Sequence, residues 1–395
     1  MDFLFTDNLL LVPLEIRKDK KSHIVEDILL GEFYEMPDVC VEGIHLIQGQ
    51  LELGKVEQVL KERFPHEDVQ ILEFAGQLFQ LNLIKSINGN DILRNEKQKE
   101  TNGFLSIPSK LGEFFFNRFS NWLYFVIFFV NILLLIIYPN LIPHYKDLFV
   151  FHFMAMNIIA LFLLSSIIIL IHEIGHILAM RAYGLPTKLR LGHRLFLIVL
   201  ETDMSPAWKL PSKDRNVLYL AGISFDSVIL FESLCVQIFL PNLSPFMLGV
   251  SRIIVFDVCI RLIYQCCIYM KTDLYFVFEN ATGCYNLMEN AGELIRQKLP
   301  FFKSCRNETI YGEEKNVIFS YAIFYAIGVG LTVSLYLVYY IPQLLYAIKK
   351  ALPGMFQPVS EYAFWDSMLF VLQLAISFGI LFYSWSKKYR SARYV

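Results

Sequence analysis

Residues 161–180 read LFLLSSIIILIHEIGHILAM, and this stretch carries both the architecture and the chemistry that we expect. The run from 148 to 171 has no charged residue apart from the titratable His152. A helix that crosses a bilayer needs roughly 20 predominantly apolar residues, and this run is long enough. The motif His-Glu-x-x-His follows at once, at 172–176. The stretch therefore predicts a membrane-spanning helix with a polar motif at one end.

Five further segments resemble this one in composition. The chain is 55% hydrophobic and only 18% charged, which excludes a single soluble globule. We expect a polytopic α-helical membrane protein of about six transmembrane helices, over 119–143, 148–171, 217–240, 246–270, 316–348 and 367–386. Asp257 and Arg261 stand four residues apart in the fourth segment, which predicts an intramembrane ion pair. Glu232, in the third segment, has no assigned role.

Basic residues gather in alternate loops and set the expected orientation. The loops after the second and fourth spans and the C-terminal tail are rich in them, whereas the other loops are poor. The residues concerned are Arg181, Lys188, Arg190, Arg194, Lys209, Lys213, Arg215, Lys271, Arg296, Lys298, Lys303, Arg306, Lys315, Lys387, Lys388, Arg390 and Arg393. With six spans, both termini are expected in the cytoplasm. The N-terminus has no basic region followed by an apolar run, so a secretory signal peptide is not expected.

The N-terminal region differs from the rest in charge. Residues 1–115 hold 20 acidic and 12 basic side chains, whereas the remainder holds 17 acidic and 23 basic ones. Hydrophobic periodicity predicts a small cytoplasmic α+β domain over 1–87 and a polar linker over 88–117. We expect strands over 9–14, 23–30 and 32–36, helices over 39–48, 51–64 and 67–81, and a returning strand over 81–87.

The stretches GIHLIQGQLELGKVEQVLKERF (43–64) and DVQILEFAGQLFQLNLI (68–84) carry a resemblance. They resemble the winged-helix peptide-recognition domain of ribosomal peptide biosynthesis, which implies a precursor-peptide leader as the partner of this domain. A DNA-binding winged helix is the rival, but the acidic surplus opposes phosphate binding, so no nucleic-acid partner is expected. A plain regulatory or packing domain is the other alternative.

The motif at 172–176 points to a metal. His172 and His176 lie four residues apart on one helix face, so both imidazoles can bind one ion, and the adjacent Glu173 can serve as general base. Ionisable groups inside a membrane are costly and need partners. A catalytic zinc usually takes a third protein ligand, and the topology brings Asp273 and Asp226 to the same face as the motif. The alternative is a polar cluster that is satisfied without a metal.

The body of the chain resembles the site-2 protease family of intramembrane zinc metalloproteases, closest to the bacterial branch found with peptide-maturation genes. The resemblance implies a four-helix membrane core over 118–300, followed by two additional C-terminal transmembrane helices over 301–395. Beyond the histidine motif it rests on TDMSPAWKLPSKDRNVLYLAGISFD (202–226) and QCCIYMKTDLYF (265–276). It implies Zn²⁺ held by His172, His176 and Asp273, with Glu173 catalytic.

The same resemblance implies that Gly222 and Asp226 position the substrate. This chain departs from the family pattern at Ile223 and Ile268, where the family has proline, at Leu274 in place of glycine and at Asp226 in place of asparagine. In the family these motif positions help to fix the substrate backbone, so the departures bear on substrate binding and on the rate of turnover.

These patterns together lead to one expected function and one alternative. We expect a zinc-dependent intramembrane endopeptidase in the bacterial plasma membrane. It would cleave a membrane-associated peptide or protein, such as a modified-peptide or bacteriocin precursor. The alternative is a catalytically inactive membrane peptide-binding, immunity or export-scaffold protein.

Overall fold

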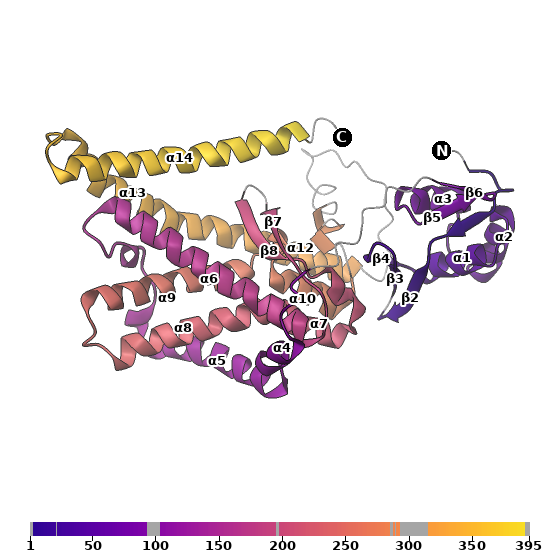
Figure 1. Cartoon of the computed structure of the whole chain (residues 1–395), viewed down its shortest axis with the longest axis horizontal. Helices are drawn as coiled ribbons and strands as arrows, with labels where there is room; N and C mark the ends of the chain where they lie inside the picture. The colour runs from indigo at the N-terminus through magenta and orange to yellow at the C-terminus, as the bar shows by residue number, and fades with distance from the viewer. Residues whose placement is uncertain are drawn as a thin grey trace. The chain divides into compact units, whose positions relative to one another are not determined.

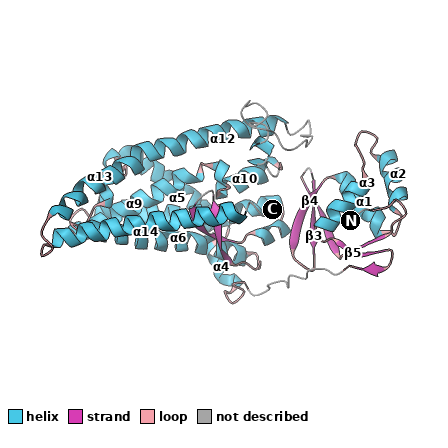
Figure 2. Cartoon of the chain, turned by 90° about the horizontal axis from the view of Figure 1, so that it is seen from above, coloured by secondary structure: helices cyan, strands magenta, loops and turns pink. Residues whose placement is uncertain are grey.

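The computed structural model describes residues 3–20, 22–92, 103–194, 197–284, 287–288, 290–292 and 315–391. The chain is mostly helical, with a small N-terminal sheet domain (Figures 1 and 2). It divides into two compact units. The head unit consists of Met1–Gly103 and Met204–Arg215, and the helical unit consists of Phe104–Asp203 and Asn216–Val395.

The head unit contains two three-stranded antiparallel sheets, ordered β1-β5-β6 and β2-β3-β4. Pro13 separates β1 from β2, because proline has no N–H to donate to a strand ladder. The single strand expected over 9–14 is therefore two strands in different sheets. The strands are β1 (Leu9–Leu11), β2 (Leu14–Asp19), β3 (Ser22–Asp27), β4 (Glu32–Met36), β5 (Ile84–Ile87) and β6 (Asn90–Asp91).

Three helices complete the head unit where three were expected: α1 (Asp38–Gln48), α2 (Leu53–Arg63) and α3 (Ile71–Gln80). Their apolar faces meet in one core, in which Ile44, Val56, Leu60, Ala75 and Leu78 are buried. This core belongs to the head unit alone, as expected for a domain of ordinary polarity.

Five helical segments of the described chain are long and apolar enough to cross a membrane, consistent with a membrane protein. They are Arg118–Ile137, Met154–Ala182, Ser212–Phe239, Val317–Phe356 and Tyr362–Ile380. The sixth expected span, α9 (Pro245–Gln265), is a helix of 21 residues. It is not among these five, because every 18-residue stretch of it contains three charged residues, Arg252, Asp257 and Arg261.

The helical unit is built mainly from α5, α6, α8, α9, α12, α13 and α14. Its α-helices are α4 (Ser109–Phe115), α5 (Arg118–Ile137), α6 (Met154–Ala182), α7 (Ser212–Tyr219), α8 (Ala221–Phe239), α9 (Pro245–Gln265), α10 (Asp273–Thr282), α12 (Lys315–Leu335), α13 (Ile341–Ala351) and α14 (Tyr362–Ser391). A π-helical turn, η5 (Tyr336–Tyr340), joins α12 to α13. Strands β7 (Leu189–Arg194) and β8 (Leu197–Thr202) form an antiparallel hairpin. The 3₁₀ helices of this unit are η1 (Pro139–Leu141), η2 (Tyr145–Leu148), η4 (Ile268–Met270) and η6 (Leu352–Phe356). The 3₁₀ helix η3 (Ser205–Lys209) and the first four residues of α7 belong to the head unit.

Two expectations fall partly on segments that the structure does not describe. The expected linker over 88–117 includes 93–102, which lie outside the described residues, but it also contains β6 and α4. The basic loop expected after the fourth span includes Arg296, Lys298, Lys303 and Arg306, which lie outside them too, as does Arg393 of the C-terminal tail.

Helix α6 has close neighbours because small residues line it. A Cβ added at Gly112 of α4 would come within 2.9 Å of the Ala182 Cα, and one added at Gly175 of α6 would lie 2.8 Å from the Ala221 carbonyl oxygen. Small residues of this kind let helix backbones approach closely. The N-terminal end of α8 is thereby brought against the part of α6 that carries the histidine motif.

Polar groups join the other helices to α6. Asp366 of α14 accepts hydrogen bonds from the backbone N–H groups of Met154 (2.8 Å) and Ala155 (2.9 Å), and so caps the N-terminal end of α6. The expected ion pair of Asp257 with Arg261 is present at 2.8 Å. Ser165 of α6 donates a hydrogen bond of 2.6 Å to the same aspartate. Asp257 and Arg261 of α9 are therefore partnered within the bundle.

Candidate metal centre

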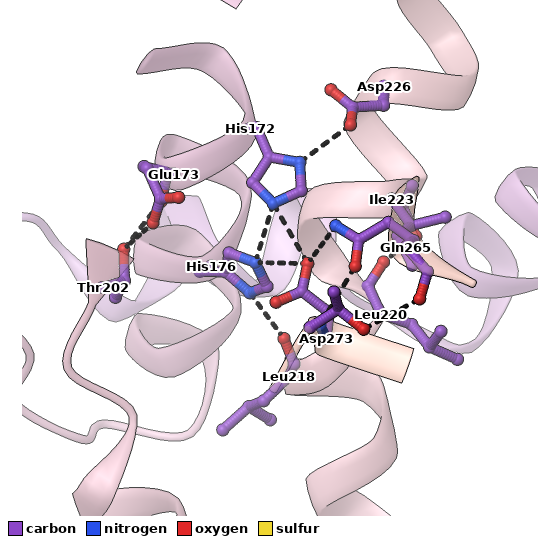
Figure 3. Close-up of polar contacts among 12 residues, drawn as sticks. His172, Glu173, His176, Thr202, Leu218, Leu220, Ile223, Asp226, Gln265 and Asp273 are labelled. Atoms are coloured by element: carbon purple, nitrogen blue, oxygen red, sulfur yellow. Dashed lines mark hydrogen bonds and ion pairs between the residues drawn. The ribbon is translucent and has the colours of Figure 1, made fainter. Parts of the chain in front are cut away.

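Three side chains distant in the sequence converge on one point in the helical unit (Figure 3). His172 and His176 come from α6, and Asp273 is the first residue of α10. The Nε2 atom of His172 lies 3.3 Å from Nε2 of His176 and 3.1 Å from Oδ2 of Asp273. The remaining distance, from Nε2 of His176 to the same oxygen, is 3.4 Å. All three side chains are buried. Of the two third ligands that topology allowed, Asp273 is the one that joins the histidines.

The hydrogen bonds behind the imidazoles determine which nitrogen carries the proton. Nδ1 of His176 lies 2.9 Å from the Leu218 carbonyl oxygen, which can only accept. Nδ1 of His172 lies 2.8 Å from Oδ2 of Asp226, a carboxylate acceptor that is fully buried. Both Nδ1 atoms therefore donate, and both Nε2 atoms present lone pairs to the centre of the cluster.

This arrangement fits a zinc ion. Three ligands bound tetrahedrally at about 2.0–2.1 Å would lie about 3.3–3.4 Å from one another. The three donor separations, 3.1, 3.3 and 3.4 Å, agree with that spacing. Two imidazole lone pairs and one carboxylate oxygen at such distances repel one another unless a cation lies between them. Two nitrogens and one oxygen form a donor set that zinc accepts in catalytic sites, with a further position left open.

Asp273 is held by Gln265, a residue to which sequence reasoning assigned no role. The Gln265 side chain donates to Oδ2 of Asp273 (2.9 Å) and accepts from its backbone N–H (3.0 Å). Metal binding requires a deprotonated carboxylate at Asp273 and neutral imidazoles at His172 and His176. The signal for Gln265 was its place at the start of the motif that contains Asp273.

Glu173 lies beside the two histidines on α6 and is also buried. Its carboxylate accepts a hydrogen bond of 2.7 Å from the hydroxyl of Thr202, the last residue of β8 (Figure 3). Sequence reasoning missed Thr202 as well, because its contact with Glu173 joins two elements 29 residues apart.

Gly222 and Asp226, expected to position the substrate, both lie against His172 and His176 or one of them. A Cβ added at Gly222 would lie 2.6 Å from Nε2 of His176 and closer still to the ring of His172. Asp226 holds His172 from behind, as described above. Both residues of α8 therefore shape the ligand set itself. Glu232, on the same helix, is exposed.

The chain was compared with protein-family models, with curated proteins and with solved structures. None of the three comparisons finds a match.

Proposed function

We propose that this protein is a zinc-dependent intramembrane endopeptidase. One observation carries the proposal: two imidazole nitrogens and a carboxylate oxygen converge at zinc-ligand spacing, and five helices of the described residues are apolar enough to cross a membrane. His172, His176 and Asp273 would hold the ion. Zinc bound there would act as a Lewis acid that acidifies a water molecule and polarises a peptide carbonyl.

Glu173 performs the proton transfers in this proposal. It lies next to a ligand on the same helix and is buried, so its carboxylate can take a proton from the attacking water. It then returns that proton to the nitrogen of the departing amine. Thr202 holds one carboxylate oxygen and leaves the other for this work.

The substrate class follows from the surroundings of the site. Since two of the three proposed ligands, His172 and His176, lie on a helix long and apolar enough to span a bilayer, the substrate is a membrane-associated peptide or protein. We further propose the bacterial plasma membrane, with both termini in the cytoplasm, on the basis of the loop charges. The head unit would recruit the leader of a modified-peptide or bacteriocin precursor, in keeping with its resemblance to winged-helix peptide-recognition domains.

The decisive test compares wild type with Glu173→Gln in detergent micelles. Zinc per chain is measured by elemental analysis, and cleavage is measured by mass spectrometry on a proteome-derived peptide library. Both proteins should bind one zinc, and the variant should lose cleavage by about 10²–10⁴-fold, because the amide cannot take up the proton. Equal cleavage by the variant would refute the mechanism.

The catalytically inactive peptide-binding, immunity or scaffold protein remains the second candidate. The replacements at Ile223, Ile268 and Leu274 favour it, because they lie in the stretches that resemble the protease motifs. A wild-type protein that holds zinc but cleaves no library peptide would support this candidate. Wild type without zinc would exclude the protease.

The role of the head is tested separately. Deletion of residues 1–90 should weaken binding of a candidate leader peptide, as measured by fluorescence anisotropy. Unchanged binding and cleavage would remove the recognition role and leave the zinc site unaffected.

A further inference from the structure

The head unit contains a segment from the middle of the chain. Residues Met204–Arg215 pack with the N-terminal domain as one compact unit, although the residues on either side of them belong to the helical unit. The segment begins two residues after Thr202 and ends three residues before Leu218. These are the two residues that support Glu173 and His176, respectively.

A buried ion pair holds the C-terminal end of this segment. A guanidinium nitrogen of Arg215 lies 2.8 Å from a carboxylate oxygen of Asp19, the last residue of β2. The two side chains are only 1% and 8% exposed. Nε of Arg215 donates to the Leu210 carbonyl (2.9 Å), and the guanidinium stacks 4.5 Å from the centre of the Trp208 ring. Removing one partner of such a pair leaves a buried charge without compensation, so this contact resists opening.

A second ion pair holds the middle of the segment. Nζ of Lys209 lies 2.7 Å from Oε1 of Glu26 on β3, whose side chain is 6% exposed. Arg17 of β2 donates to the backbone carbonyl of Lys209. Strands β2 and β3 pair directly with each other. Strands β2 and β3 of the head therefore hold the segment at two points.

The two ion pairs act on the metal centre through the covalent chain that leaves the segment at each end. On the N-terminal side, the segment continues from β8, whose Thr202 donates to the carboxylate of Glu173. On the C-terminal side it continues through α7, whose Leu218 carbonyl fixes the tautomer of His176. Motion of the segment would displace both Thr202 and Leu218, because they lie only two and three positions from its ends.

We propose that Asp19 and Glu26 of the head are positioning residues for the metal centre, which they serve by holding residues 204–215 and thereby Thr202 and Leu218. The proposal rests on the proposed function, since it treats the centre as the catalytic site. It gives the head a role in catalysis that is independent of peptide recognition.

The test uses the full-length protein in detergent and zinc itself as the probe. Zinc affinity is measured by competition with a chromophoric chelator, and amide hydrogen exchange is followed over 197–203 and 216–222. Lys209→Glu and Glu26→Lys should each weaken zinc binding about tenfold and speed exchange in both stretches. The double variant, which restores opposite charges, should return both quantities to within about twofold of wild type. Glu42→Lys is the control, because it breaks an exposed ion pair with Arg63 elsewhere in the head.

Cleavage of the library peptide that wild type cuts best adds a second readout. The single variants should lower kcat and leave KM unchanged, because they disturb support of the centre and not peptide binding. Asp19→Asn keeps the side-chain shape and serves as the test if a charge-reversed protein fails to fold. It should also weaken zinc binding, speed exchange in both stretches and lower kcat.

The proposal is overturned if folded Asp19→Asn and the single variants keep wild-type zinc affinity and exchange, or if the double variant recovers nothing. Wild type without zinc would instead refute the proposed function. In that case, hydrogen exchange measured without metal would still show whether the head slows exchange in residues 197–203 and 216–222.

Discussion

Gly222→Ala tests the geometry of the metal centre most sharply. The added Cβ would lie 2.6 Å from Nε2 of His176, and ordinary contact begins at 3.4 Å. The ring or the helix must therefore retreat by about 0.8 Å, whereas metal–ligand distances vary by only about 0.2 Å. The added Cβ would lie closer still to the ring of His172, so both imidazoles would have to move from their present positions.

We expect Gly222→Ala to weaken zinc binding about 100-fold, equivalent to about 2.8 kcal/mol, since it displaces both histidines from their supports. Chelator competition on detergent-purified protein measures this change. Gly330→Ala on α12 is the matched control, because no atom lies within 4 Å of its added Cβ, and it should bind zinc as wild type does. Wild-type affinity in Gly222→Ala would show that the two imidazoles do not converge as described.

Three further substitutions probe the supports of the centre and of the bundle. Asp226→Ala should weaken zinc binding about 10–100-fold by freeing His172, as read by the same competition, whereas Asp226→Asn, which keeps an acceptor oxygen, should lose less. Thr202→Val should lower kcat about tenfold at full zinc occupancy, because Glu173 loses its hydrogen bond; a loss of zinc instead would contradict this reading. Asp366→Ala should lower the free energy of unfolding by about 1 kcal/mol in thermal unfolding, since it uncaps α6, while Asp366→Asn should be nearly neutral.

The spans could be predicted from the sequence because hydrophobicity and helix length are local properties. The apolar runs around α5, α6 and α14 coincide with candidate spans of the structure. The sixth expected span, α9, is a helix as predicted, but every 18-residue stretch of it contains three charged residues, unlike the five candidate spans. Its ion pair was also predictable, because Asp257 and Arg261 lie one helical turn apart.

The N-terminal domain could be predicted in most of its elements but not in its partner. The three helices and strands β1, β3, β4 and β5 were expected from local periodicity, whereas β2, β6 and the break at Pro13 were not. The ion pairs of Asp19 and Glu26 with Arg215 and Lys209 span more than 180 residues of sequence. An acidic surplus indicates that basic partners are favourable, yet it does not say which ones pack against the sheet.

The sequence by itself determined that His172 and His176 share one helix face, because they lie four residues apart, and that Glu173 lies beside them. The tertiary structure brings Asp273, which the resemblance had implied as the third ligand, to both imidazoles, and it alone placed Asp226 behind His172. It alone revealed the Leu218 carbonyl, since every residue has such a group and no sequence pattern marks the one that will accept a hydrogen bond. Helix spacing is a property of one segment, whereas the direction of an imidazole depends on atoms that other segments bring to it.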